Sequence, residues 1–202
     1  MIRPLEIQIF VSNPRDVEKE KKIIEDVCAR INTTLELNNC SVRYFVKEWK
    51  KLILKFGVNA QTEIENSIKE YDIYIGIMWK KYGSDVGAIN PQTGSDYGSG
   101  TVKEFFIAYD SFKRKGVPTM YMYFKDQNNG PLSDLDLDEL RKVSEFRKSQ
   151  ETNGFCYRFK NKNDFKDKIT DLLYQTALNL CDKAKKQQKQ EVYEKKEITL
   201  EF

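Results

Sequence analysis

The sequence predicts an α/β domain, doubly wound, in which a five-stranded and mainly parallel sheet carries helices on both faces. Three observations support this prediction. Strand-like and helix-like segments alternate along the chain, which is the pattern of parallel sheets with helical connections. Residues 72–79, Asp-Ile-Tyr-Ile-Gly-Ile-Met-Trp, are nearly continuously apolar, as expected of a central strand covered on both faces. The 202 residues, 40% of them hydrophobic, are enough for one domain with a sizeable core.

The first half of the chain predicts two strand–helix units. A β-rich run at 5–11 precedes Asn13, which is predicted to cap a helix, and Pro14, which is predicted to fill its first position. A second strand is predicted at 42–47 and a second helix around 59–70. The first helix, of about five turns, is predicted from apolar residues at helical spacing: Val17, Ile24, Val27, Cys28, Ile31 and Leu35.

The second half continues the alternation. A long loop at 80–99 contains several glycines and leads from the apolar strand into a third helix at about 101–115, which has one apolar face and ends at Gly116. The remaining predicted elements are a strand at 119–124, a helix around 135–151, a short strand near 155–159 and a last helix from 162.

The last helix loses its apolar stripe after Leu180. From Ala184 to Glu197 the side chains are mainly those of Lys, Gln and Glu, which is typical of a solvated helix. We therefore predict an α/β domain at 1–180 and a charged helical extension or linker at 181–202.

Composition excludes several classes of function. The formal net charge is only +3, from 34 Lys and Arg against 31 Asp and Glu, so we expect neither direct nucleic-acid binding nor membrane binding, which need a concentrated basic face. The chain has no histidine, which excludes catalytic pairs built on His and His-ligated metals, and we expect no metal site.

Four cysteines without a C-x-x-C pair do not indicate a disulfide scaffold. No signal peptide and no membrane-spanning apolar run is visible. The sequence therefore predicts a cytoplasmic protein.

Candidate functional residues gather where the predicted strands end. In a doubly wound sheet, ligands bind beyond the carboxyl ends of the strands, at the point where the direction of winding changes. Here those ends are the loops that follow Val11, Lys47, Trp79 and Lys125.

The segment 98–104, Gly-Ser-Gly-Thr-Val-Lys-Glu, supports two interpretations. In the first, Thr101 and Glu104 form a capping box, in which each side chain bonds the backbone amide of the other residue. In the second, Glu104 binds a ribose hydroxyl or stabilises positive charge at an anomeric carbon. The glycines do not form a phosphate loop, because neither G-x-x-x-x-G-K-[ST] nor G-x-G-x-x-G is present.

Other side chains at the strand ends also allow two interpretations each. Trp79 ends a buried strand and is either a core residue or a ligand platform, and Trp49 follows the second strand and could stack on an aromatic ring. Arg15 follows the first strand and is either solvated or a phosphate ligand.

Several motifs in order resemble a TIR-like family of domains of unknown function. Residues 9–17, Ile-Phe-Val-Ser-Asn-Pro-Arg-Asp-Val, are similar to its opening F-V-S-S-P-x-D-V. Residues 72–79, followed by Lys-Tyr-Gly at 81–83, resemble its D-I-F-I-G-I-x-W-x-R-F-G strand and turn. Residues 99–105 resemble its S-G-T-x-x-E-F helix start, and the likeness covers about residues 5–175.

The resemblance implies a fold of the TIR-like/flavodoxin-like type and a role in larger proteins. Such domains stand at the N-terminus of STAND-type, NLR-like ATPases, including bacterial antiphage systems, as effector or signalling modules. They are similar to TIR domains, many of which cleave NAD with a glutamate. They are also similar to nucleoside deoxyribosyltransferases, whose D-x-G-T-x-x-E-x-G-x-A motif matches Gly100, Thr101, Glu104 and Ala108, whereas Gly98 and Phe106 depart from it.

On this basis we predict an effector domain that hydrolyses the N-glycosidic bond of NAD or a related nucleotide and is activated by self-association through an attached ATPase or sensor region. NAD is the substrate, no cofactor is required, and Glu104 is the catalytic residue. The alternative is a non-catalytic oligomerisation or signalling adaptor, with Glu104 as a helix cap. The predicted substrate-binding residues are Ser12, Asn13, Arg15, Asp16, Trp49, Trp79, Tyr82, Gly83, Gly100 and Thr101.

Overall fold

The computed structural model describes residues 5–47, 71–91, 94–126 and 135–200, with the side chains of the last helix described as far as Lys183. Its centre is a five-stranded sheet in which every pair of neighbouring strands is parallel, in the order β2-β1-β3-β4-β5. The predicted doubly wound α/β fold is confirmed. The strands are β1 (Leu5–Ser12), β2 (Val42–Lys47), β3 (Ile73–Met78), β4 (Thr119–Lys125) and β5 (Cys156–Phe159).

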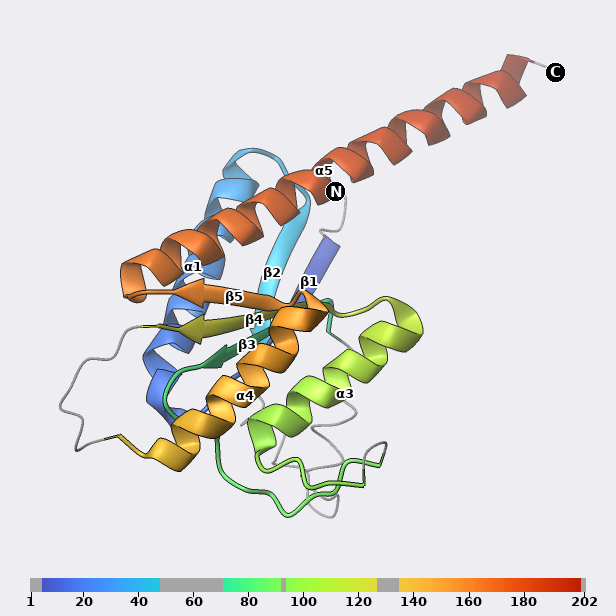
Figure 1. The fold of residues 1–202 in the computed structure, drawn as a ribbon. Coiled ribbons are helices and arrows are strands. Elements are labelled where there is room, and N and C mark those ends of the chain that lie inside the picture. Colours follow the sequence, from blue (N-terminus) through green and yellow to red (C-terminus); the bar gives the residue numbers. More distant parts are fainter. Residues whose placement is uncertain (1–4, 48–70, 92–93, 127–134, 201–202) are drawn as a thin grey trace, which may run out of the picture.

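Four described α-helices cover the two faces of the sheet. Figure 1 shows α1 and α5 together on one face and α3 and α4 on the other. The predicted helix around 59–70 lies outside the described residues. The helices are α1 (Glu18–Leu37), α3 (Gly100–Lys115), α4 (Leu137–Asn153) and α5 (Lys162–Leu200), and a short 3-10 helix, η1 (Arg15–Val17), precedes α1.

The alternation of side chains along the strands divides the core in two. Because successive residues of a strand point to opposite faces, Ile9 and Ile75 pack in the cluster under α1 and α5, whereas Phe10 and Tyr74 pack in the cluster under α3 and α4. All six residues of β3 are buried, which confirms the prediction of a central strand.

The first helix begins later than predicted. Asn13 does not cap it, because its side-chain amide donates to the carbonyl oxygen of Pro14 at 2.9 Å. Pro14 lies in extended backbone ahead of η1, and α1 starts only at Glu18. The capping interpretation of Asn13 is therefore wrong.

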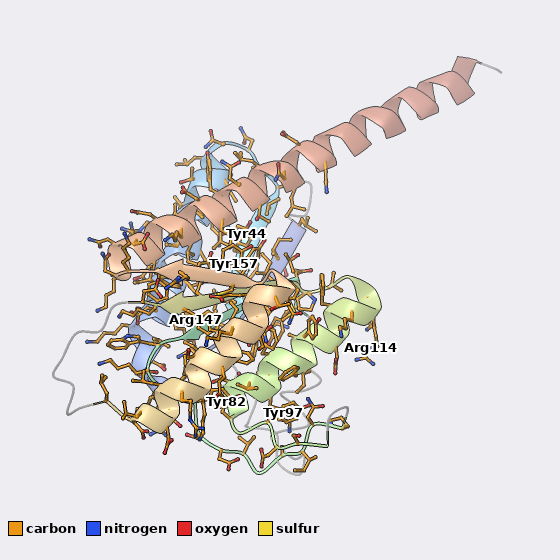
Figure 2. All side chains as sticks on the ribbon, in the orientation of Figure 1. Tyr44, Tyr82, Tyr97, Arg114, Arg147 and Tyr157 are labelled. Atoms are coloured by element: carbon orange, nitrogen blue, oxygen red, sulfur yellow. A yellow bond between two sulfur atoms is a disulfide. The ribbon has the colours of Figure 1, made fainter. Side chains whose placement is uncertain are left out.

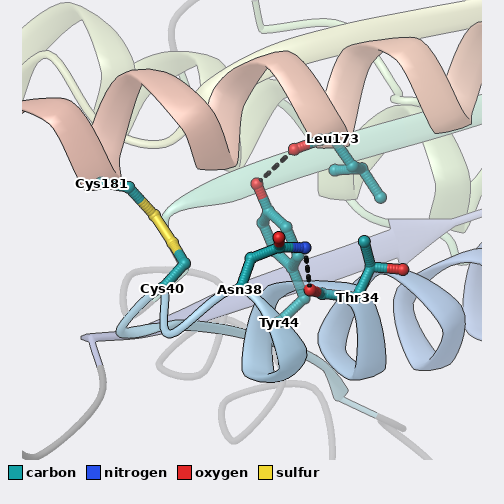
Figure 3. The surroundings of a disulfide bond; sticks show 6 residues. All are labelled: Thr34, Asn38, Cys40, Tyr44, Leu173 and Cys181. Atoms are coloured by element: carbon teal, nitrogen blue, oxygen red, sulfur yellow. Dashed lines mark hydrogen bonds between the residues drawn. A yellow bond between two sulfur atoms is a disulfide. The ribbon is translucent and has the colours of Figure 1, made fainter.

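Two bonds link the helix α5 to β2 and to the turn that precedes it. Cys181 on α5 forms a disulfide with Cys40, which follows α1, at a Cα–Cα distance of 6.0 Å (Figure 3). On the same helix the carbonyl oxygen of Leu173 accepts a 2.7 Å hydrogen bond from the buried Tyr44 hydroxyl. The sequence did not predict the disulfide, since the two cysteines lie 141 residues apart.

Beyond Cys181 the helix α5 continues to Leu200 without a break and extends away from the sheet (Figure 1). The predicted boundary between 180 and 181 thus falls inside one helix. None of the described helices contains a stretch long and apolar enough to cross a membrane.

Candidate functional site

The winding of the sheet changes direction between β1 and β3. The chain moves outward from β1 to β2 and then returns past β1 to β3, and this order places the ligand-binding crevice of doubly wound folds at the carboxyl ends of those two strands. Ser12, the last residue of β1, lies opposite Gly76 of β3. Its side chain is buried at this junction, with 1% of the residue exposed.

Ser99, and not Thr101, caps α3. The Ser99 hydroxyl accepts from the amide of Val102 at 3.2 Å, and its backbone is extended. The helix starts at Gly100, one residue earlier than predicted, so Thr101 already lies inside it and is buried. The predicted capping box of Thr101 and Glu104 is therefore wrong, because Ser99 occupies the cap position.

The carboxylate of Glu104 reaches from α3 to the end of β1. Its Oε2 accepts a hydrogen bond from the Ser12 hydroxyl at 2.5 Å, across 92 residues of sequence. Burial raises the pKa of Glu104 from its ordinary value of 4.5 to about 7, and the Ser12 hydrogen bond and the charge of Lys21 partly oppose that rise. A carboxyl group in this position exists in both protonation states near neutral pH.

Tyr74 is a third polar residue at this junction, on the side of the sheet that α3 and α4 cover. It is fully buried on β3, and its hydroxyl finds no hydrogen-bond partner among the described residues. Burial raises the pKa of Tyr74 well above its ordinary value; the charge of Glu104 adds to the rise and the Ser12 hydroxyl opposes it. Buried hydroxyls are normally bonded, so an unpaired phenol beside Ser12 and Glu104 marks this junction as a candidate site.

A second charged cluster lies at the carboxyl end of β4. The Lys125 ammonium is 2.8 Å from the Glu20 carboxylate, and the two side chains are only 11% and 2% exposed. The same ammonium lies 4.2 Å from the centre of the Trp79 ring, and that of Lys80 lies 4.5 Å from it. Trp79, which follows β3, also packs against the core under α1 and α5, whereas Glu104 belongs to α3 on the other face of the sheet.

Asp16 ties the loop after β1 to the loop after β3. Its Oδ2 accepts from the backbone amides of Lys80 and Lys81 at 3.0 and 3.1 Å. Its Oδ1 is buried and has no partner among the described residues. The structure thus gives Asp16 a direct role in holding the rim of the site together.

Tyr82, Gly83 and Gly100 join the loop after β3 to the starts of α3 and α4. The Tyr82 amide donates to Glu139 at 2.8 Å, and Figure 2 shows Tyr82 beside the beginnings of these two helices. Gly83 has a φ of +115°, and a Cβ there would lie 3.1 Å from the Cβ of Ser99, so this position needs glycine. The Gly100 amide bonds the carbonyl oxygen of Ser84 at 3.0 Å.

Three predicted site residues remain: Asn13, Arg15 and Trp49. Asn13 is half-buried next to Ser12, and Arg15 is exposed on η1. Trp49 lies outside the described residues. In the described part of the chain, no group of three or more acidic or cysteine side chains could hold a metal ion.

The sequence analysis missed Tyr74 and Lys21. Lys21 is 8% exposed in the first turn of α1, and its charge favours the ionised form of Glu104. One signal could have found it: Val17, Lys21, Ile24 and Cys28 follow each other at helical spacing, so Lys21 falls on the apolar stripe. A lysine on such a stripe is an exception that needs a reason.

A hollow of about 520 Å³ lies elsewhere, between α1 and β2. Asn32 and Tyr44 are among its lining residues, and the Asn32 side-chain amide bonds the backbone of Tyr44 twice, at 2.8 Å each. It includes none of the predicted site residues.

The sheet order and the polar junction between β1 and β3 define a doubly wound α/β protein with its candidate site at the switch point. The chain belongs to the family described as "Domain of unknown function (DUF4062)", which matches residues 8–174. No curated protein matches the sequence.

Proposed function

We propose that this chain is a TIR-like effector domain that hydrolyses the N-glycosidic bond of NAD or a related nucleotide, with Glu104 as the catalytic residue. The observation that carries the proposal is the contact between Glu104 and Ser12 at the β1–β3 junction. It joins the Glu104 carboxyl group to the end of the strand where doubly wound proteins bind ligands.

The chemistry needs little more than a well-placed carboxylate. In NAD the bond between ribose C1′ and the cationic nicotinamide ring breaks, its electron pair goes to the ring nitrogen, and neutral nicotinamide leaves. Positive charge then develops on the ribose, where the ionised Glu104 stabilises it. Water adds to C1′ and gives up a proton, so that ADP-ribose is the other product. The reaction requires no cofactor or metal ion.

The raised pKa of the Glu104 carboxyl group supports this role. A pKa near 7 keeps a large share of Glu104 ionised at neutral pH, and its desolvated position strengthens its effect on a nearby cation. Ser12 orients the carboxylate, and Asp16 holds the loop after β3 against the loop after β1. We further propose that the domain acts in the cytoplasm and is activated when an attached STAND ATPase assembles in bacterial antiphage defence.

The test is nicotinamide release from NAD. The full chain is assayed free in solution and anchored in many copies on vesicles, which imitates assembly. We expect release from the anchored protein and a loss of at least about a hundredfold in the rate with Glu104→Gln. Glu36→Gln, at a side chain that is 72% exposed, is the matched control and keeps the rate. No release from the anchored wild type, or equal release from Glu104→Gln, contradicts the proposal.

The second candidate is an adaptor that transmits assembly without catalysis. The observation that favours it is the long uninterrupted α5, which extends from the fold to Leu200 (Figure 1) and suits a rigid connection to a further region. An adaptor releases no nicotinamide in either format, and Glu104→Gln leaves its self-association unchanged.

A further inference from the structure

The disulfide between Cys40 and Cys181 lies where α5 leaves the body of the domain (Figure 3). Among the residues whose side chains are described, Cys181 is the last one buried in the core under α1 and α5. From there the helix continues to Leu200 and extends away from the sheet (Figure 1). The disulfide therefore joins the start of the outgoing part of α5 to the turn between α1 and β2.

Cys40 makes this disulfide accessible from solution. It lies between the exposed residues Asn39 and Ser41 and is itself only half-buried, whereas Cys181 is 6% exposed. Thiol–disulfide exchange needs a sulfur atom that an attacking thiolate can reach. A thiol in solution can therefore attack the Cys40 sulfur while the protein stays folded, with Cys181 as the leaving thiolate.

The packed part of α5 is also held by contacts that do not involve the disulfide. Leu173 and Ala177 are completely buried, and the carbonyl oxygen of Leu173 accepts the hydrogen bond from the Tyr44 hydroxyl. These contacts precede Cys181 on the helix, so they remain when the sulfur–sulfur bond is broken. What the bond adds is the attachment of the last buried turn, which ends at Cys181.

The other two cysteines are less suited to this chemistry. Cys28 and Cys156 are free thiols, and burial raises the pKa of Cys28 to about 12 and that of Cys156 to about 11. Because the thiolate is the reactive form of cysteine, both side chains are poor nucleophiles at neutral pH. They provide internal controls in the same chain.

We propose that Cys40 and Cys181 form a reversible thiol–disulfide pair, which fixes the outgoing part of α5 to the domain when oxidised and releases it when reduced. The reductant is a small thiol such as glutathione. Its thiolate bonds to the Cys40 sulfur, the bond to Cys181 breaks, and Cys181 leaves as a thiolate and takes up a proton. A second thiol then frees Cys40 as a thiol, and the two small molecules leave as their own disulfide. Oxidised glutathione reverses both steps.

The first experiment equilibrates the full chain, without denaturant, in buffers of reduced and oxidised glutathione at different ratios. Free thiols are then blocked with an alkylating reagent and located by peptide mass spectrometry. We expect Cys40 and Cys181 to change together between a disulfide and two thiols as the ratio changes, whereas Cys28 stays a thiol throughout. A pair that stays oxidised at all ratios, or stays reduced at all of them, overturns the proposal.

Hydrogen exchange then measures what the bond does to α5. We expect the amides of residues 178–183 to exchange at least about tenfold faster in the reduced protein, because this end of the packed helix then opens locally. The amides of residues 170–177 should keep their rates, since Leu173 and Tyr44 stay in contact. Equal rates at 178–183 in the two states overturn the proposal. A loss of protection at 170–177 as well would show that the bond holds the fold itself, which also overturns it.

Serine variants check that the response comes from this pair. Cys40→Ser cannot form the bond, so without any reductant it should exchange like the reduced wild type. Cys156→Ser is the matched control and should respond to glutathione as the wild type does. If Cys40→Ser does not fold, Cys181→Ala takes its place. A bond-deficient variant that exchanges like the oxidised wild type overturns the proposal. None of these measurements involves NAD, so their outcome is independent of the proposed hydrolysis.

Discussion

Glu20 and Glu104 are acidic residues at the same end of the sheet, but they have different partners. Glu20, on the α1–α5 face, has its carboxylate 2.8 Å from the ammonium of Lys125, at the end of β4. Glu104, on the α3–α4 face, is held by the neutral hydroxyl of Ser12, at the end of β1. The charge of the Glu20 carboxylate is balanced by a cation in direct contact, whereas that of the Glu104 carboxylate is not.

The difference separates a structural charge from a candidate catalytic one. A buried ion pair neutralises both of its members and leaves them little capacity to respond to a ligand. A buried carboxyl group without a cation in direct contact takes a raised pKa, as Glu104 does, and such groups cluster at functional sites. Proximity to the strand ends alone would have selected both residues; the partner of each carboxylate distinguishes them.

Breaking the ion pair should have the largest effect. Lys125→Met leaves the carboxylate of Glu20, of which 2% is exposed, without its counter-charge, and we expect the free energy of unfolding to fall by about 3–5 kcal/mol. Urea unfolding measures it. The double variant Glu20→Leu/Lys125→Met should recover most of the loss, because it removes both charges. A loss below about 1 kcal/mol would show that the pair behaves like a surface salt bridge.

Glu104→Gln should stabilise the protein at neutral pH. The folded-state pKa of about 7 lies above the ordinary 4.5, so the folded chain holds this proton more tightly than the unfolded chain. Stability from this group is therefore present below pH 4.5, is lost as pH rises through 7, and is absent above it. At pH 8 we expect the variant to be more stable by up to about 3 kcal/mol. Near pH 4.5 the two proteins should unfold alike.

The side-chain amide that Glu104→Gln introduces can still accept from Ser12, so this comparison keeps the contact. Urea unfolding at the two pH values checks the prediction. A variant that is equally or less stable than the wild type at pH 8 would mean that the charge of Glu104 is balanced in the folded protein, much as that of Glu20 is.

Ser12→Ala should have the smallest effect of the three. The hydroxyl favours the ionised form of Glu104, so its removal should move the Glu104 titration to higher pH by about one pH unit. The pH at which wild-type stability declines should move with it. Ser144→Ala, a half-buried serine of α4, serves as the control. An unchanged titration would show that the hydroxyl does not stabilise the carboxylate.

The sequence predicted the order of the elements well because each depends on a local pattern. The apolar run at 72–79 and the glycine at 116 are examples: one forms the buried β3, and the other ends α3 with a φ of +72°. The choice of Glu104 as the candidate catalytic residue depended on a motif, and its position near the start of α3 follows from the same motif.

The contacts of Glu104 could not be predicted in this way. Its partner Ser12 lies 92 residues away, and no local pattern encodes that pairing. The prediction of the capping residue, which used a local rule, was wrong. The helix α3 starts one residue earlier than predicted, so its cap is Ser99 and not Thr101. Lys21 was overlooked because the periodicity was read for apolar residues only, although the lysine falls on the same stripe.

The titration of the Glu104 carboxyl carbon tests the central claim most directly. Carbon-13 NMR of protein labelled at its glutamate carboxyl groups, with Glu104→Gln to assign the signal, gives its midpoint. Our account predicts a midpoint near pH 7, well above those of the exposed glutamates. A midpoint near the ordinary value of 4.5 would show that Glu104 is a solvated side chain and would contradict its assignment as the working group of the site.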